Sequence, residues 1–348
     1  MSADLSFYIV TLVVYAAVAV IGCWGLELQY SDTGLLNLSY IVSVAVGGYT
    51  VALLSLGPPE ADGGTVVQEY FWGASLPFPL PFVGAALAGM LISLPIGLVA
   101  LRRLRSDYQA VAMLSVALIA GALVVAMPGL LGGGHGLYLI PAPLKKELGL
   151  RSDEYSWLYA GFAVLLTVLA AWVVLRISRA PLWRVLRAVR ENPEAADALG
   201  INVTPVRLSA FAVGNGLGAL SGAVLAAFIG TYAPSDWSYQ ETLILMGAVI
   251  VGGAGNRFGV LLGALLLPVG LTEATRYLPQ FGAPGTVDAL QYVVVGLVII
   301  AFLWWRPQGV FPERKRIFGL DGQPVPFWET LRRGSQSRVP IEAEQGVA

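Results

Sequence analysis

Charged side chains are scarce in this chain of 348 residues, where Asp, Glu, Lys and Arg make up 12% against 56% hydrophobic residues. The mean hydropathy of +0.71 lies well outside the range of soluble globular domains. This balance argues against a soluble globular enzyme and indicates a chain that lies in a lipid bilayer. The net charge of −1 points to no particular partner, and we expect no nucleic-acid ligand.

Cysteine and histidine are nearly absent, since Cys23 and His135 are the single residues of their kinds. One cysteine cannot form an internal disulfide, and in an apolar run it is expected to be a buried structural thiol. One histidine cannot build a zinc site alone, so we expect no bound metal. The motif GxxxxGK[ST] is missing, and GGGHG at Gly132–Gly136 has no following Lys, so no P-loop is predicted. No Ser–His–acid arrangement stands out, and no catalytic residue is assigned.

Charge-free apolar runs are abundant, and each is long enough to cross a bilayer, which takes roughly 20 residues as a helix. Six of these runs are Leu5–Leu26, Thr33–Pro59, Tyr70–Leu101, Tyr108–Leu144, Tyr155–Leu175 and Leu208–Ser235. With the late part of the chain included, they predict an all-α fold: a polytopic helical membrane protein with about eight transmembrane spans.

The late part of the chain is less regular. Thr242–Asn256 and Phe258–Thr272 flank Arg257, and each would reach only about 22 Å as a helix, short of the roughly 30 Å hydrocarbon core. They are predicted to be either a re-entrant pair of short helices or two spans extended by polar ends. Ala289–Trp305 is the expected last span, with a tryptophan pair as its interfacial anchor.

The 21 basic residues gather in alternate connections between the runs. They concentrate after the third run, between the fifth and sixth, and after the last, whereas the loop Gly57–Glu69 has acids and no base. Because Lys and Arg favour the cytoplasmic side, we expect the amino terminus outside and the carboxyl terminus in the cytoplasm. No Lys or Arg precedes the first run, so a cleavable signal is not expected there.

No Asp, Glu, Lys or Arg lies near the middle of a predicted span. Proton-coupled carriers usually keep such a group, because burying it is costly and only function retains it. Sodium coupling through carbonyl and hydroxyl oxygens would not need one. The composition therefore favours a conduit whose energy comes from elsewhere.

One connection is polar and ordered: RAVRENPEAADALGIN, Arg187–Asn202. Asn192 can cap a helix that has Pro193 at its first position and Glu194 in its first turn, and Gly200 suits a left-handed end. The arginines at 184, 187 and 190 recur every three residues, as on one helical stripe. A helix over Pro193–Leu199 is predicted, which is either an ordinary interfacial helix or a docking helix for a cytoplasmic partner.

This segment carries a resemblance to a known family. Glu194-Ala195-Ala196 followed by Gly200 looks like the EAA-x3-G coupling motif of ABC importer permeases, and the chain resembles the LivM-type permeases of branched-chain amino-acid ABC transporters, a family that also includes urea and amide permeases. The supporting stretches, in order, are GLELQYSDTGLLNLSY with GGYTVALLS, LLGGGHGL, LWRVLRAVRENPEAADALGIN, GAVIVGGAGNRFGVLLGALLL and RPQGVFPE. Together they cover roughly residues 20 to 313.

The resemblance implies a division of labour in a prokaryotic cell (inner) membrane. This chain would pair with a second, LivH-type permease subunit, two cytoplasmic ATPase subunits and an external substrate-binding protein. ATP would bind on the partner subunits, and this chain would hold no cofactor. Residues 1–313 would form the permease domain with its coupling loop at 178–206, and 314–348 a flexible cytoplasmic tail. The residues expected to couple to the ATPase are Arg187, Arg190, Glu194, Ala195, Ala196 and Gly200.

The resemblance also places two polar residues, Asn37 and Asn215, in helices near the centre of the permease. A polar side chain in an apolar span is costly unless it is satisfied. The two asparagines are therefore expected either to line the substrate pathway, together with Tyr40 and Tyr49, or to form hydrogen bonds between helices.

Two further classes remain beside the ABC permease. An ion-coupled secondary carrier or channel for a small solute would have the same apolar runs, and would work without ATPase partners. A membrane enzyme would need a catalytic cluster that the sequence does not show. ATP hydrolysis that requires co-purified partners would distinguish the ABC permease from the secondary carrier or channel.

Overall fold

The computed structural model describes residues 3–58, 68, 70–103, 106–276, 286–306 and 308–312. All of these belong to one compact unit, Met1–Pro312. The expected tail, 314–348, and most of the acidic loop Gly57–Glu69 lie outside the described residues.

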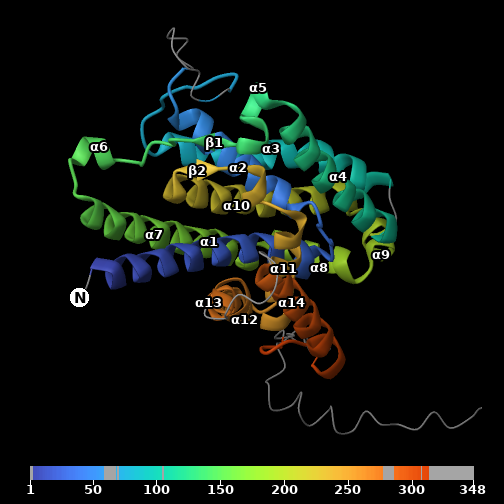
Figure 1. Cartoon of the computed structure of the whole chain (residues 1–348). Coiled ribbons are helices and arrows are strands. Elements are labelled where there is room, and N and C mark those ends of the chain that lie inside the picture. The colour runs from blue at the N-terminus through green and yellow to red at the C-terminus, as the bar shows by residue number, and fades with distance from the viewer. Residues whose placement is uncertain are drawn as a thin grey trace, which may run out of the picture. The chain divides into compact units, whose positions relative to one another are not determined.

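The described residues confirm the polytopic all-α fold (Figure 1). Six helices are long and apolar enough to cross a membrane: α1 (Ala3–Thr33), α3 (Leu80–Arg103), α4 (Ser106–Ala126), α7 (Ser152–Arg179), α10 (Val203–Ile229) and a continuous helix that starts with α12 (Arg257–Ala264). Two shorter apolar helices, α2 (Tyr40–Ser55) and α14 (Thr286–Trp305), accompany them. Together they give the expected number of about eight.

Short elements connect the long helices. They include α5 (Pro128–Leu131), η1 (Gly133–His135), β1 (Leu137–Tyr138), α6 (Lys145–Leu148), β2 (Thr231–Tyr232) and η2 (Pro234–Asp236). The two strands are antiparallel, and Leu137 pairs with Tyr232. The connection between α7 and α10 consists of α8 (Pro181–Glu191) and α9 (Pro193–Ala198).

In the late part of the chain, α11 (Tyr239–Gly252) is short, whereas α12 starts a continuous helix that is long enough to cross a membrane. Its segment therefore fits the expected span extended by polar ends. Helices α11 and α12 pack against each other across a tight turn, and Asn256 caps α12 by accepting hydrogen bonds from the N–H groups of Phe258 and Gly259, at 3.2 and 3.3 Å. After α12 the helix continues as η3 (Leu265–Leu271) and α13 (Thr272–Arg276). The wider π-helical hydrogen bonding of η3 accommodates Pro268, which has no N–H to donate.

The first helix is longer than its charge-free run predicted. The predicted boundary at Leu26 is wrong, because α1 continues through Glu27 and Asp32 to Thr33. Both carboxylates are buried, so they are part of the packed bundle and do not mark a loop. The helix ends at Gly34, whose positive φ of +72° is a conformation that glycine adopts without strain. The chain then turns back toward α2, which begins only at Tyr40.

Helix α10 packs against α1, α2 and α3 at the centre of the bundle (Figure 1). Its glycines recur every four residues, which lets neighbouring backbones approach closely. A Cβ added at Gly222 would overlap the backbone of Val44 in α2, and one added at Gly214 would contact Gly25 and Gln29 in α1. The same device recurs at Gly47, which lies on the backbone of Ala219. The glycine repeat therefore serves close helix packing.

Gly222→Ala should destabilise the protein, because the added methyl group meets the backbone of Val44 and α2 must move away. Overpacking of this kind costs about 1–3 kcal/mol. Thermal unfolding of the purified protein in detergent measures the effect. The matched control is Gly161→Ala in α7, where an added Cβ meets nothing within 4 Å. Equal midpoints for the two variants would contradict the packing role of Gly222.

Candidate functional site

The segment between α7 and α10 forms two short helices whose ends are set by local sequence. Pro181 occupies the first turn of α8, where its missing N–H costs nothing. Asn192 ends α8 and caps α9, since its side-chain Oδ1 accepts a hydrogen bond from the Ala195 N–H at 2.9 Å. Pro193 and Glu194 follow in the first turn of α9, as the sequence predicts. The boundary between the two helices is thus fixed at Asn192.

The other end of α9 closes on Gly200, which has a φ of +83°. The Ile201 N–H donates to the Ala196 carbonyl at 3.0 Å, and the Gly200 N–H donates to the Asp197 carbonyl at 2.8 Å. This is the Schellman arrangement that a left-handed glycine permits. The predicted helix and its left-handed end are confirmed, with the helix one residue shorter than expected.

Part of α9 is presented outward. Glu194, Ala195 and Gly200 are exposed, whereas Ala196 is buried against the rest of the chain. Sequence reasoning missed Leu199, which follows α9 and is 82% exposed. The signal for it was the apolar residue placed directly before the left-handed glycine. Glu194, Ala195, Leu199 and Gly200, hereafter the α9 tip, could contact a partner.

Of the three arginines in the predicted stripe on α8, Arg184 is exposed, whereas the other two are half-buried. The guanidinium of Arg187 lies 3.9 Å from the centre of the Trp183 ring, a cation–π contact. Arg190 donates to the backbone carbonyl of Ser31 at the end of α1. Beneath them Leu186 and Val189 are buried and anchor α8 to the bundle. Of the two predicted coupling arginines, Arg187 thus contacts its own helix and Arg190 contacts the end of α1.

The structure brings Asn37 and Asn215 together in a buried network, hereafter the polar centre. The Asn37 Nδ2 donates to Gln29 Oε1 at 2.7 Å and to Asn215 Oδ1 at 3.2 Å. Ser39 and Ser43 donate through their hydroxyls to the two asparagines, each at 2.7 Å. These five residues join α1, α2, α10 and the link between α1 and α2.

The two predicted tyrosines lie at different levels of α2. Tyr40 borders the polar centre, and its hydroxyl donates to the carbonyls of Gly22 and Gly214 at 2.8 and 3.3 Å. Tyr49 is about 13 Å further along the helix. There it meets the ring of Tyr232 edge-on and accepts a hydrogen bond from Trp237 Nε1 at 3.4 Å. The tyrosines therefore belong to two separate clusters.

A buried ion cluster at the end of α1 was not expected from the sequence. The guanidinium of Arg257 lies 3.2 Å from Glu27 Oε2 and 2.7 Å from Asp32 Oδ2. Its Nη2 also donates to the Ser178 hydroxyl in α7 at 2.7 Å. The available signals were the acids just after the first run and the lone Arg257 between two short runs.

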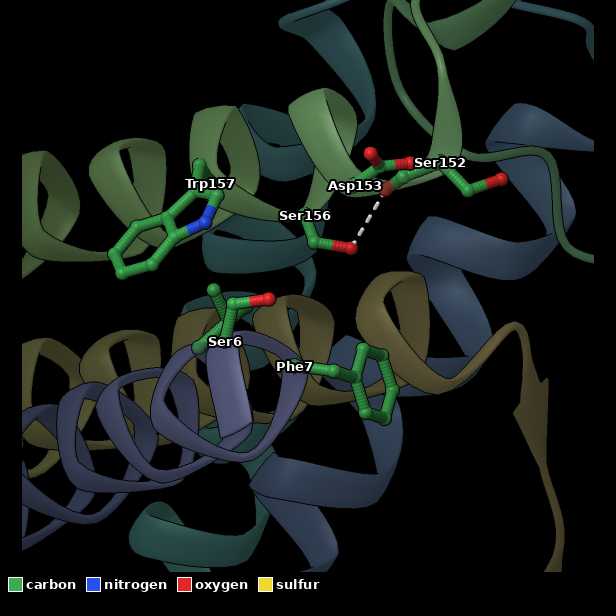
Figure 2. A pocket seen from close by; sticks show the side chains of 7 residues that line it. Ser6, Phe7, Ser152, Asp153, Ser156 and Trp157 are labelled. Carbon is green, nitrogen blue, oxygen red and sulfur yellow. Dashed lines mark hydrogen bonds between the residues drawn. The ribbon is translucent and has the colours of Figure 1, made fainter. Parts of the chain in front are cut away.

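A shallow pocket lies at the other end of α1, between its first turns and those of α7 (Figure 2). Phe7 and Trp157 flank it and are partly exposed, and Asp153 provides its one carboxylate. The hydrogen bond drawn there joins the Ser156 hydroxyl to the Ser152 carbonyl within α7, at 2.8 Å. None of the predicted site residues lines this pocket.

The family of permease components of branched-chain amino acid transport systems has a model that matches residues 8–303. The chain belongs to this family. The ion cluster, the polar centre and the α9 tip all lie within the matched residues.

Individual relatives agree with the family assignment. The branched-chain amino acid permease protein LivM of Escherichia coli is 29% identical over 83% of this chain, which covers 66% of that relative's length. A probable LivM of Methanocaldococcus jannaschii is 25% identical, covering 83% of this chain and 89% of the relative. The LivH permease protein of Escherichia coli is 24% identical, covering 87% and 93%. No solved structure matches the chain.

In this member of the family, Asn215→Ala should destabilise the bundle. The change leaves the donors of Asn37 and Ser43 without their shared acceptor, and each buried unsatisfied group costs about 1–3 kcal/mol. Ser43→Ala is the control, because it removes one donor while Asn215 keeps its bond to Asn37. Unfolding in detergent should show the larger loss for Asn215→Ala, and an equal or smaller loss would contradict the shared-acceptor role.

Proposed function

We propose that this chain is the LivM-type permease subunit of an ABC importer for branched-chain amino acids. It forms the translocation pathway together with a LivH-type permease subunit. Two cytoplasmic ATPase subunits bind ATP and dock on the α8–α9 segment, and an external binding protein delivers the amino acid. Family membership and the similarity to both LivM and LivH proteins support this assembly.

The observation that carries the proposal is the α9 tip. The helix α9 is short and capped at both ends, and its tip exposes Leu199 beside Glu194 and Ala195. An exposed, rigidly held apolar side chain in a polar connection is a suitable anchor for a pocket on a partner. Because Asn192 and Gly200 fix both ends, a force on α9 is transmitted to α8 and α10 with little local bending.

We further propose that the α8–α9 end faces the cytoplasm, with the amino terminus outside. Three arginines of α8 and Arg207 near the start of α10 lie at this end. Basic residues favour the cytoplasmic side of membrane proteins, where the ATPase subunits would be. In this orientation the β1–β2 pair and the glycine-rich turn before it lie outside.

Leu199→Asp should weaken docking of the ATPase subunits. Loss of an interface anchor costs about 2 kcal/mol or more, which corresponds to an association weaker by at least about thirtyfold. Co-purification of the ATPase subunits with the permease pair measures this, together with uptake of radiolabelled leucine into proteoliposomes. Leu139→Asp, at a leucine also well exposed but between β1 and α6, is the matched control.

Three results would count against the proposal. One is normal ATPase binding by Leu199→Asp, and another is equal loss in Leu139→Asp. The third is leucine uptake by the permease subunits alone under an ion gradient, which would indicate a secondary carrier.

Gly200→Val should leave the complex inserted but uncoupled. A side chain at φ +83° is strained, and a β-branched one more than alanine, so the exit of α9 should change direction. An added Cβ meets nothing within 4 Å, so the effect is conformational and not a clash. ATP hydrolysis and leucine uptake are measured together in proteoliposomes. The amount of leucine taken up per ATP hydrolysed should fall more in Gly200→Val than in Gly200→Ala. Wild-type ratios in Gly200→Val would reduce α9 to an ordinary interfacial helix.

A further inference from the structure

The ion cluster described above joins the docking segment to the membrane helices. Arg257 is the first residue of α12, and its guanidinium reaches Glu27 and Asp32 at the end of α1 and Ser178 in α7. Asp32 carries the connection onward, because its second oxygen, Oδ1, accepts a hydrogen bond from Trp183 Nε1 in α8 at 3.1 Å. One carboxylate thus binds both α12 and α8.

We propose that Arg257 and Asp32 are positioning residues that transmit movement of the α8–α9 segment to α1 and α12 during transport. The inference rests on the proposed function, in which ATPase subunits move this segment. It assigns the transmission to two particular side chains that lie outside the docking surface.

The attachment of α8 to α1 is short and directional. Trp183 bonds to Asp32, and Arg190 bonds to the carbonyl of Ser31, the preceding residue. The two donors lie two turns apart on α8, so they fix the tilt of the helix as well as its position. A displacement of α8 must therefore either carry the end of α1 with it or break the bond to Asp32.

The ion cluster is expected to contribute little to the net stability of the fold. Buried ion pairs contribute little compared with apolar residues of the same volume, because desolvating the charges offsets their attraction. The attraction offsets the desolvation only where the geometry of the pair is good. Removing one partner leaves a buried charge uncompensated. Glu27 and Asp32 are both fully buried, so the position of Arg257, and with it the start of α12, is tied to the position of α1.

Movement of α12 has a route into the bundle. α12 packs against α1 and α11, and α11 in turn meets the start of α2, where Thr242 Oγ1 accepts a hydrogen bond from the Ile41 N–H at 3.1 Å. Ile41 lies next to Tyr40, which borders the polar centre. The ion cluster therefore stands between the docking segment and the buried core of the permease.

Trp183→Phe is the sharpest test. It removes the indole donor to Asp32 and keeps a smaller aromatic ring for Arg187 to lie on. Loss of a hydrogen bond to a charged group shifts an equilibrium by about tenfold. We expect leucine transported per ATP hydrolysed to fall by up to about tenfold, with the ATPase subunits still bound. The matched control is Trp24→Phe, which removes an indole donor to the backbone carbonyl of Arg257 but leaves the charges and α8 in place.

Asp32→Asn provides an independent variant. It keeps an acceptor for Trp183 while removing the charge that holds Arg257, so it tests the α12 side of the connection. The same ratio of leucine to ATP should fall, measured in proteoliposomes that contain the full complex and the external binding protein. If the cluster only stabilised the fold, Asp32→Asn would instead lower the thermal midpoint and the yield of complex, and the ratio of leucine to ATP would stay unchanged.

The outcomes separate this inference from the proposed function. A wild-type complex without ATP-dependent leucine uptake overturns the proposed function itself. A working wild-type complex in which assembled Trp183→Phe and Asp32→Asn retain the normal ratio overturns the positioning role. A loss in Trp24→Phe equal to that in Trp183→Phe also overturns it, because any change near Arg257 would then suffice.

Discussion

The buried carboxylates of Glu27 and Asp32 impose the most demanding requirement in this bundle. An ionised group in an apolar interior is tolerated only where partners are already in place, and here a single guanidinium, that of Arg257, reaches both. To supply it, α12 must begin at the end of α1. That placement forces the tight turn after α11 and brings Ser178 of α7 into contact with the same guanidinium. The remaining carboxylate oxygen of Asp32 then fixes α8 through Trp183. Four helices are thus positioned by the satisfaction of two acids.

The glycines of α10 solve a second problem, which is how amide side chains can meet between apolar helices. Hydrogen bonds at 2.7–3.2 Å between Gln29, Asn37 and Asn215 require the backbones of α1 and α10 to lie unusually close. A side chain at Gly214 would prevent this, because its Cβ would contact Gln29. Close packing and polar satisfaction therefore depend on each other in the centre of the bundle. The hydrogen bonds hold the register, and the absent side chains provide the space.

What the sequence predicts well is local. Asn192, Pro193 and Gly200 determine both ends of α9 within nine residues, and the structure agrees because capping needs only neighbours. The end of α1 was predicted wrongly because a run of uncharged residues is a poor guide where acids have a distant partner. Arg257 lies 225 residues along the chain from Asp32, and no local pattern reveals that pairing. The exposure of Leu199 depends likewise on how α9 sits against the bundle, which buries Ala196 and leaves Leu199 outside.

The mutual hydrogen bonds of the polar centre limit how it could serve a solute. If Asn37 and Asn215 line the pathway, opening it must break their mutual hydrogen bond and those to Gln29 and Ser43. Each such bond contributes about 0.5–1.5 kcal/mol net, but a buried group left without any partner costs more. An amino acid offers an ammonium and a carboxylate that can replace the lost partners, whereas an apolar solute offers none. A pathway through this point would therefore favour a zwitterion by exchange of hydrogen bonds, with no charged side chain required near the middle of the bundle.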